Sequence, residues 1–199
     1  MSHEKVLADL KALIKLDLSG TDPLQHRAHV EGESDRSALI LNAALVEHFV
    51  LRQLEDAMPS LNGNERERIF NFEGPCGSFA NRLRLAHGLG IIDRGERKRF
   101  EIVKDMRNVA AHCHPPLTFS TPEIHRAVAA LYPEANRTEI MSWGRRRIRE
   151  AFEGFCAYSI KALGAGDELH PTNLLEIVKA RPKRRQKSPK KSSQAPRVQ

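Results

Sequence analysis

The sequence predicts an all-α protein, a single helical bundle of about six helices followed by a disordered basic C-terminal tail. Apolar residues recur at spacings of three and four along most of the chain, and helix start and stop residues separate these stretches. No window of more than a few residues alternates with the period of two that a strand requires. At 199 residues the chain is long enough for one domain with a sizeable core and short for two.

Residues 1–33 are expected to form an N-terminal helix and a linker. Over residues 4–18 the apolar positions follow the helical period on one side, and polar residues take the other. The helix should end at Ser19-Gly20, and residues 21–32 are polar enough to be a linker. Acidic residues weaken any attraction to anionic lipid, so bundle packing or dimer formation accounts for this helix better than a membrane surface does. The apolar residues are Val6, Leu7, Leu10, Leu13 and Ile14, and the opposite side carries Lys5, Asp9, Lys11 and Lys15.

Residues 34–165 are expected to form the helical domain, beginning with its central helix. Ser34 is placed to cap this helix with Asp35 in its first turn, and the helix should run to Met58, before Pro59. Its apolar face is wide enough for a helix with neighbours on several sides. One stripe holds Leu41, Leu45 and Phe49, with Ala38 and Arg52 beside it, and it is broadened by Leu39, Val46, Val50 and Leu54.

Shorter elements follow the central helix. Glu65 to Phe72 should be a short helix, and the glycines of Gly74-Pro75-Cys76-Gly77 mark a tight backbone path. Ser78 is placed to cap a helix that continues to Leu89, with Gly90 as its C′ residue.

Three more helices are expected over residues 93–112, 121–131 and 136–164. The first opens with Asp93 and Glu96 as a capping-box pair and cannot extend past Pro115-Pro116. The second has Pro122 at its first position, and the third opens at Asn136 and ends at Gly164.

The basic character of the chain is concentrated in residues 179–199, which hold nine of the 32 basic residues and no acid. The rest of the chain then has 23 basic against 25 acidic residues, so it is not a basic fold. We expect residues 166–199 to be disordered and to attract RNA or DNA phosphates, although a solubilising tail explains the composition equally well. The nucleic-acid-binding candidates are Lys183, Arg184, Arg185, Lys187, Lys190 and Lys191.

Several classes of protein are excluded or disfavoured. Phosphate-binding loops, GxGxxG, HExxH, GxSxG and CxxC patterns are all absent, and no apolar run approaches the roughly 20 residues of a membrane span. Cys76, Cys113 and Cys156 are widely spaced and odd in number, which favours free thiols. We therefore expect a cytoplasmic protein without cofactor or metal.

One group of residues has catalytic potential. Asn108 and His112 are four residues apart and share a helix face, and the long side chain of Arg107 can swing towards them. Arg107 would neutralise charge on a phosphate, His112 would move the proton of a ribose 2′-hydroxyl, and Asn108 would orient one of them. The alternative is structural: Arg107 pairs with an acid, while Asn108 and His112 bond the helix end to a loop.

Two weaker candidates lie nearby in the sequence. His112, Cys113 and His114 could bind zinc, but consecutive residues point apart. Trp143 could stack on a base, although it more commonly belongs to a core while the arginines beside it form a solvated face. Those arginines are Arg145, Arg146, Arg147 and Arg149.

Four stretches together resemble a known family. In order and at similar separation, Ser34–Ala38, Gly74–Ala86, Gly88–Ile92 and Met106–His112 are similar to the mannitol operon repressor (MltR-like) family, whose members show "gPlgsfsaRi.layalGli" followed by "irkiRN.fAH". The resemblance covers about residues 34–130. We expect the departures at Asn81, Arg84 and His87 to alter a surface only.

This resemblance implies an all-helical regulator, of repressor or co-repressor type, that lacks a recognisable DNA-reading helix and acts with partners. An operon-encoded protein is one such partner, and RNA or DNA is another. The Arg107-x4-His112 spacing is also similar to the motif of HEPN-domain proteins, whose nuclease members cleave RNA between two subunits. That likeness implies a HEPN-like bundle, a homodimer and a metal-independent endoribonuclease, a toxin or defence effector, with Arg107, Asn108 and His112 as its catalytic residues.

Overall fold

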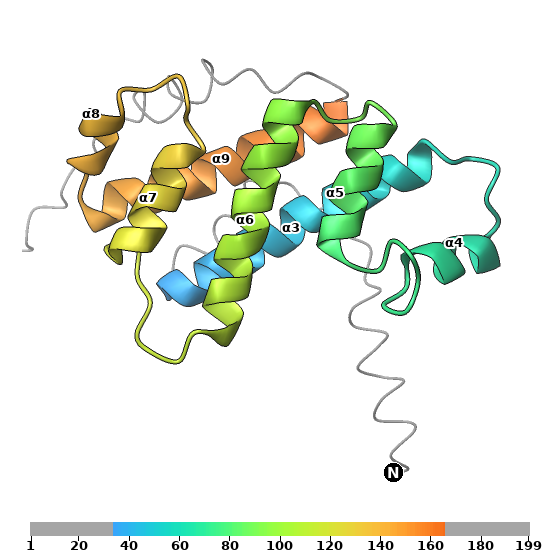
Figure 1. The fold of residues 1–199 in the computed structure, drawn as a ribbon, viewed down its shortest axis with the longest axis horizontal. Coiled ribbons are helices and arrows are strands. Elements are labelled where there is room, and N and C mark those ends of the chain that lie inside the picture. Colours follow the sequence, from blue (N-terminus) through green and yellow to red (C-terminus); the bar gives the residue numbers. More distant parts are fainter. Residues whose placement is uncertain (1–33, 166–199) are drawn as a thin grey trace, which may run out of the picture.

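The computed structural model describes residues 34–165, which form seven α-helices and no strand (Figure 1). The expected all-α fold is therefore confirmed for this part of the chain. The predicted helix at residues 4–18 and the basic tail lie outside the described residues. The helices are α3 (Asp35–Asp56), α4 (Gly63–Phe70), α5 (Phe79–Gly88), α6 (Arg94–His112), α7 (Pro122–Ala130), α8 (Arg137–Met141) and α9 (Arg145–Ala165).

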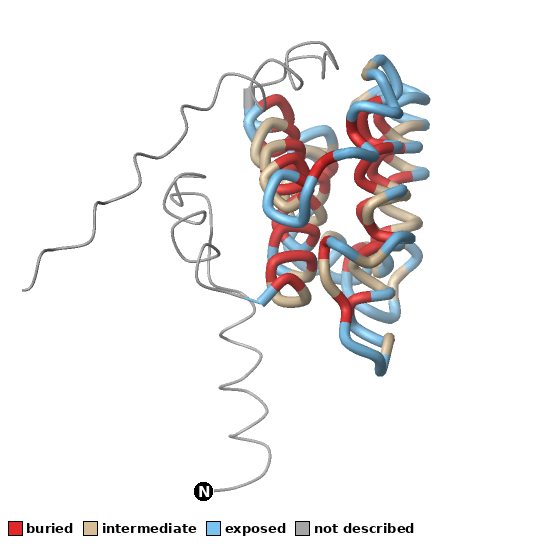
Figure 2. Tube along the Cα trace, turned by 90° about the vertical axis from the view of Figure 1, so that its left-hand side faces the viewer, coloured by how far each residue is buried: buried red, intermediate tan, exposed pale blue. Residues whose placement is uncertain are grey.

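The longer helices form two layers (Figure 2). In one layer α3 and α9 lie side by side and run in the same direction, because Asp35 at the start of α3 contacts Arg145 at the start of α9. In the other layer α6 crosses α3 with α5 and α7 on either side of it (Figure 1). Arg36 at the start of α3 contacts Ala110 near the end of α6, so those two helices run in opposite directions. The start of α3, the end of α6 and the start of α9 therefore meet at one end of the bundle.

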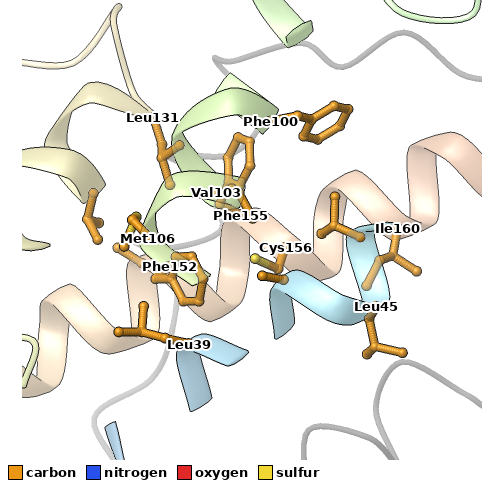
Figure 3. Close-up of a cluster of buried hydrophobic side chains, with 14 of the residues drawn as sticks. Leu39, Leu45, Phe100, Val103, Met106, Leu131, Phe152, Phe155, Cys156 and Ile160 are labelled. Atoms are coloured by element: carbon orange, nitrogen blue, oxygen red, sulfur yellow. The ribbon is translucent and has the colours of Figure 1, made fainter. Parts of the chain in front are cut away.

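The core lies between the two layers (Figure 3). Leu39 of α3, Met106 of α6 and Phe152 of α9 pack together there. The rings of Phe100 and Phe155 make an edge-to-face contact, with their centroids 6.3 Å apart. Burial of apolar side chains from both layers is the main force that holds helices of this length together. The bundle is therefore one cooperative unit rather than a string of helices.

Most of the expected helix starts are confirmed by their capping bonds. Ser34 Oγ accepts a bond from the N–H of Ser37 (3.1 Å), and Asp93 and Glu96 form the reciprocal capping box that opens α6. Gly90 has a φ of 73°, the left-handed conformation required after α5. An additional capping box at Asn62 places the start of α4 at Gly63, before the expected Glu65.

Two expected elements are corrected by the structure. The single last helix over residues 136–164 is in fact α8 and α9, because the chain turns at residues 142–144. Ser142 Oγ donates to the carbonyl of Glu139 (2.6 Å), and Gly144 supports a continuing helix poorly. The short helix ends at Phe70, since Asn71 is already extended, so Phe72 lies outside it.

The outward side of α3 also differs from expectation. Leu39, Val46, Val50 and Leu54 are fully buried, whereas Leu41, one of the three residues of the expected stripe, is 39% exposed. No helix within residues 34–165 has the length and apolar character needed to cross a membrane.

Candidate functional site

The candidate catalytic residues occupy the last two turns of α6. Arg107 Nη1 donates to Asn108 Oδ1 (3.3 Å), so the structure brings these two side chains together. His112 is the last residue of the helix and is exposed. Its imidazole makes no hydrogen bond or ion pair within the described residues. The imidazole is therefore open to solvent. It is not sealed in the interior.

The structural alternative for these residues does not describe this helix end. Within residues 34–165 Arg107 forms no ion pair with an acid, and neither Asn108 nor His112 bonds to the following loop. That role belongs to Arg36, whose Nη1 donates to the carbonyl of Ala110 (2.8 Å) and whose Nη2 donates to that of Pro115 (2.9 Å). The guanidinium satisfies the carbonyl of Ala110, which the end of α6 leaves without a helical partner, and a carbonyl of the loop that follows α6. Arg36 thus fixes the end of α6, while the side chains of Arg107, Asn108 and His112 make no bond to the following loop within the described residues.

The buried carboxylate of Asp35 also holds this end of the bundle together. Its carboxylate is 3% exposed and accepts bonds from Arg145 Nε (2.7 Å), the N–H of Phe119 (2.9 Å) and Arg149 Nη1 (3.3 Å). Burial by itself raises the pKa of Asp35, but the bonds from Arg145 and Phe119 and the two arginine charges outweigh it. The net pKa lies below its ordinary value. The carboxylate of Asp35 therefore joins three segments, which are helix α3, the loop that precedes α7, and helix α9.

Sequence reasoning missed both Asp35 and Arg36 as organising residues. It placed Asp35 only as a favourable charge in the first helical turn, and it quoted Arg36 only as part of the stretch Ser34–Ala38 that resembles a family. Their partners lie 74 to 114 residues away. No local spacing rule connects residues at that separation. The available signal was the presence of an acid and a base together at a capped helix start.

Trp143 is a core residue, as the more common alternative in the sequence analysis held. It is 6% exposed, and the guanidinium carbon of Arg147 lies 4.2 Å from the ring centroid, a cation–π contact. Arg145, Arg146 and Arg147 beside it are exposed, as expected for a solvated face, and Arg149 is half-buried. Each has an acidic partner within the described residues: Arg145 and Arg149 contact Asp35, Arg146 contacts Glu150, and Arg147 lies 3.9 Å from Glu139.

The zinc candidate receives no support from the arrangement of side chains. Among residues 34–165 no three His, Cys, Asp or Glu side chains come together in a way that could hold a metal ion. The three cysteines have free thiols, and Cys156 is fully buried against the core.

The basic residues proposed for nucleic-acid binding, from Lys183 to Lys191, lie outside the described residues.

A second candidate surface lies at the loop between α4 and α5. Phe72 on this loop is 96% exposed, although Phe70, two residues earlier, is buried. The loop is folded back on itself, since the N–H of Cys76 donates to the carbonyl of Ile69 (2.9 Å). A Cβ added to Gly74 would overlap the carbonyl oxygens of the residues that end α4, so only glycine fits this path.

Arg82 fixes the loop from the side of α5. Its Nε donates to the carbonyl of Cys76, and its Nη2 donates to that of Phe70, both at 3.0 Å. Its Nη1 forms an ion pair with Glu47 of α3, also at 3.0 Å, with both side chains largely buried. Arg82 therefore holds the loop at two carbonyls and connects it to α3 through Glu47. It presents an aromatic ring to solvent from a rigid base.

Comparison with solved structures shows a fold likeness. The chain is similar to a chain in "X-ray structure of the MtlR-HPr complex from Escherichia coli", with a TM-score of 0.52 and 22% sequence identity over 72% of this chain and 96% of that one. At this identity the likeness establishes the fold and no more. No protein-family model matches the sequence. No curated protein matches it either.

Proposed function

We propose that the protein is an MtlR-like cytoplasmic regulator, of transcriptional repressor or co-repressor type, that acts by binding a protein partner, and that this partner is HPr. The fold likeness to a chain of the MtlR-HPr complex supports the proposal, together with the four sequence stretches that resemble the mannitol operon repressor family. The observation that carries it is Phe72, exposed on a loop that Arg82 anchors.

An exposed aromatic on a rigid loop is suited to protein recognition. A phenylalanine side chain gains about 1.5–3 kcal/mol when it moves from water into an apolar pocket, and Phe72 gains almost none of this in the free protein. Because the loop is already ordered, little conformational entropy is lost on binding. A few such residues near the centre of an interface commonly supply most of the affinity. Phe72 therefore fits the role of an anchor that enters a pocket on HPr.

Isothermal titration calorimetry tests this proposal. The full-length protein should bind HPr from its own organism, and Phe72→Ala should weaken binding by about 30-fold, the equivalent of about 2 kcal/mol. Met141→Ala is the matched control, because Met141 is another exposed apolar residue and lies on α8, at the other end of the molecule (Figure 1). Absence of binding, or equal weakening by both substitutions, contradicts the proposal.

A second function is supported by one specific observation. His112 is exposed at the end of α6, and Arg107 and Asn108 are in contact one turn before it. With two copies facing one another, these residues would supply a cation and a proton-transferring imidazole to an RNA phosphodiester without metal. The alternative function is therefore a HEPN-type endoribonuclease that works as a homodimer.

Incubation of the purified protein with mixed RNA in EDTA tests the alternative. Cleavage should disappear in Arg107→Ala and in His112→Ala and should persist in His114→Ala, the control, because His114 is an exposed imidazole two residues away. If the wild-type protein leaves RNA intact, or if His114→Ala loses activity equally, the endoribonuclease is ruled out and the partner-binding regulator stands alone.

A further inference from the structure

The central helix α3 has apolar residues on nearly all sides. Its inward side holds the deep core, Ile40 and Leu51 are half-buried at the edge of that core, and its outward side exposes Leu41 and Ala44. A surface helix of a globular protein normally has a polar outward side, and a helix that is apolar all round is normally buried. Either the outward side of α3 is an unusual surface, or another segment covers it.

No described element covers that side. The described helices that pack most closely against α3 are α9, α6 and α5. Leu41 is 39% exposed and Ala44 is exposed, while Ile40 and Leu51 are half-buried. Helix α9, which packs beside α3, contains the small half-buried residues Gly154 and Ala157. Small residues here let another helix approach closely.

We propose that residues 4–18 of this chain form an amphipathic helix that packs against the outward side of α3 and α9. The apolar row of this segment, centred on Leu10, would face α3, and its lysines would remain in water on the opposite side. The expected helix is about 22 Å long, which fits within the roughly 33 Å of α3.

The position of the segment in the chain favours it over other occupants. Residue 33 leads directly into Ser34, the cap of α3, so the segment is tethered beside the surface it would cover. A linker of residues 19–33 reaches at most about 50 Å, enough for the helix to lie along α3 in either direction. A covalent tether of this length gives an effective concentration in the millimolar range. A second copy of the chain would reach that concentration only in concentrated solution.

Limited trypsin digestion of the full-length protein tests the proposal. Trypsin cleaves after Lys11 and Lys15 only when the helix is released, so cleavage there should be slow in the wild type. Leu10→Asp and Leu41→Asp should each accelerate it about tenfold, because cleavage follows the population of the released form. Cleavage at Lys183–Lys191 serves as the reference within each digest, since neither substitution should change it.

Matched controls separate docking from general destabilisation. Ala8→Asp adds the same charge on the opposite side of the segment, and Met141→Asp adds it at another surface residue, 38% exposed, on α8. Neither should accelerate cleavage. Leu10 is not one of the residues 34–165 that form the described core, so Leu10→Asp gives a readout even if Leu41→Asp unfolds the protein. Wild-type cleavage at Lys11 as fast as in Leu10→Asp overturns the proposal. Protection that disappears on dilution of a species of twice the chain mass also overturns it, in favour of a second copy.

Discussion

The carboxylate of Asp35, at the start of α3, accepts a hydrogen bond of 2.7 Å from Nε of Arg145, at the start of α9, 110 residues later in the chain. The same carboxylate accepts the N–H of Phe119 and contacts Arg149. These contacts hold together three segments at the end of the bundle where α6 also ends. Arg36, the residue after Asp35, bonds the end of α6 at the same end of the bundle.

Asp35→Asn should destabilise the fold by about 3 kcal/mol. The substitution keeps the size of the side chain but leaves the two arginines without their shared charge, and breaking a buried ion pair is costly. Urea denaturation followed by circular dichroism measures the change. Glu150→Gln is the control, because it removes an exposed pair with Arg146 on α9 and should cost less than about 0.5 kcal/mol. Equal effects of the two substitutions would show that Asp35 does not organise this end.

The contribution of Asp35 should depend on pH. Its pKa is lower in the folded protein than the ordinary value of 3.8, so the folded state favours the carboxylate. The resulting stabilisation is fully present above the unfolded-state pKa and is lost as the pH falls through the lower folded-state pKa. The difference in unfolding free energy between wild type and Asp35→Asn should stay constant from about pH 7 to pH 5 and shrink below about pH 4. If the difference in unfolding free energy between the two proteins grows towards acid pH, the predicted direction of the pH dependence is wrong.

Gly74→Ala should destabilise the loop that carries Phe72. The added methyl group would overlap the backbone carbonyl oxygens of Arg68 and Ile69, which are parts of α4 and cannot rotate away. We expect a loss of about 2 kcal/mol or more in thermal unfolding, with Phe72 no longer held in place. Gly88→Ala in α5 is the matched control, because a methyl group there meets no atom within 4 Å. It should be neutral or slightly stabilising.

Deletion of residues 179–199 should lower the affinity for RNA or DNA and flatten its dependence on salt. Nine basic residues leave with the segment, and affinity from phosphate contacts depends on the number of counterions released. Fluorescence anisotropy with a labelled oligonucleotide at several salt concentrations measures both quantities. If truncated and full-length proteins bind alike, the tail is a solubilising segment only.

Local signals predicted much of the fold. Caps at Ser34, Ser78 and Asp93, the proline at residue 122 and the glycine at residue 90 act within a few residues of themselves, so their effects can be identified without tertiary structure. The break between α8 and α9 was missed because Trp143 extends the helical apolar pattern across it. Burial of that indole was predicted, but the turn that achieves it was not.

The candidate site was predictable in part only. The sequence grouped Arg107, Asn108 and His112, and the structure places the first two in contact. It gave no indication that Arg36 holds the helix end, because that contact joins residues 74 positions apart. Phe72 was expected to be the last residue of the short helix over residues 65–72. Its exposure depends on the extended conformation of Asn71, which redirects the chain after Phe70.

Hydrogen exchange of the full-length protein, with and without saturating HPr, tests the central claim most directly. The account predicts slower exchange for the amides of residues 71–77 on addition of HPr, and no such protection in Phe72→Ala at the same concentration. Unchanged exchange in that loop, or protection confined to the end of α6 around His112, would contradict it.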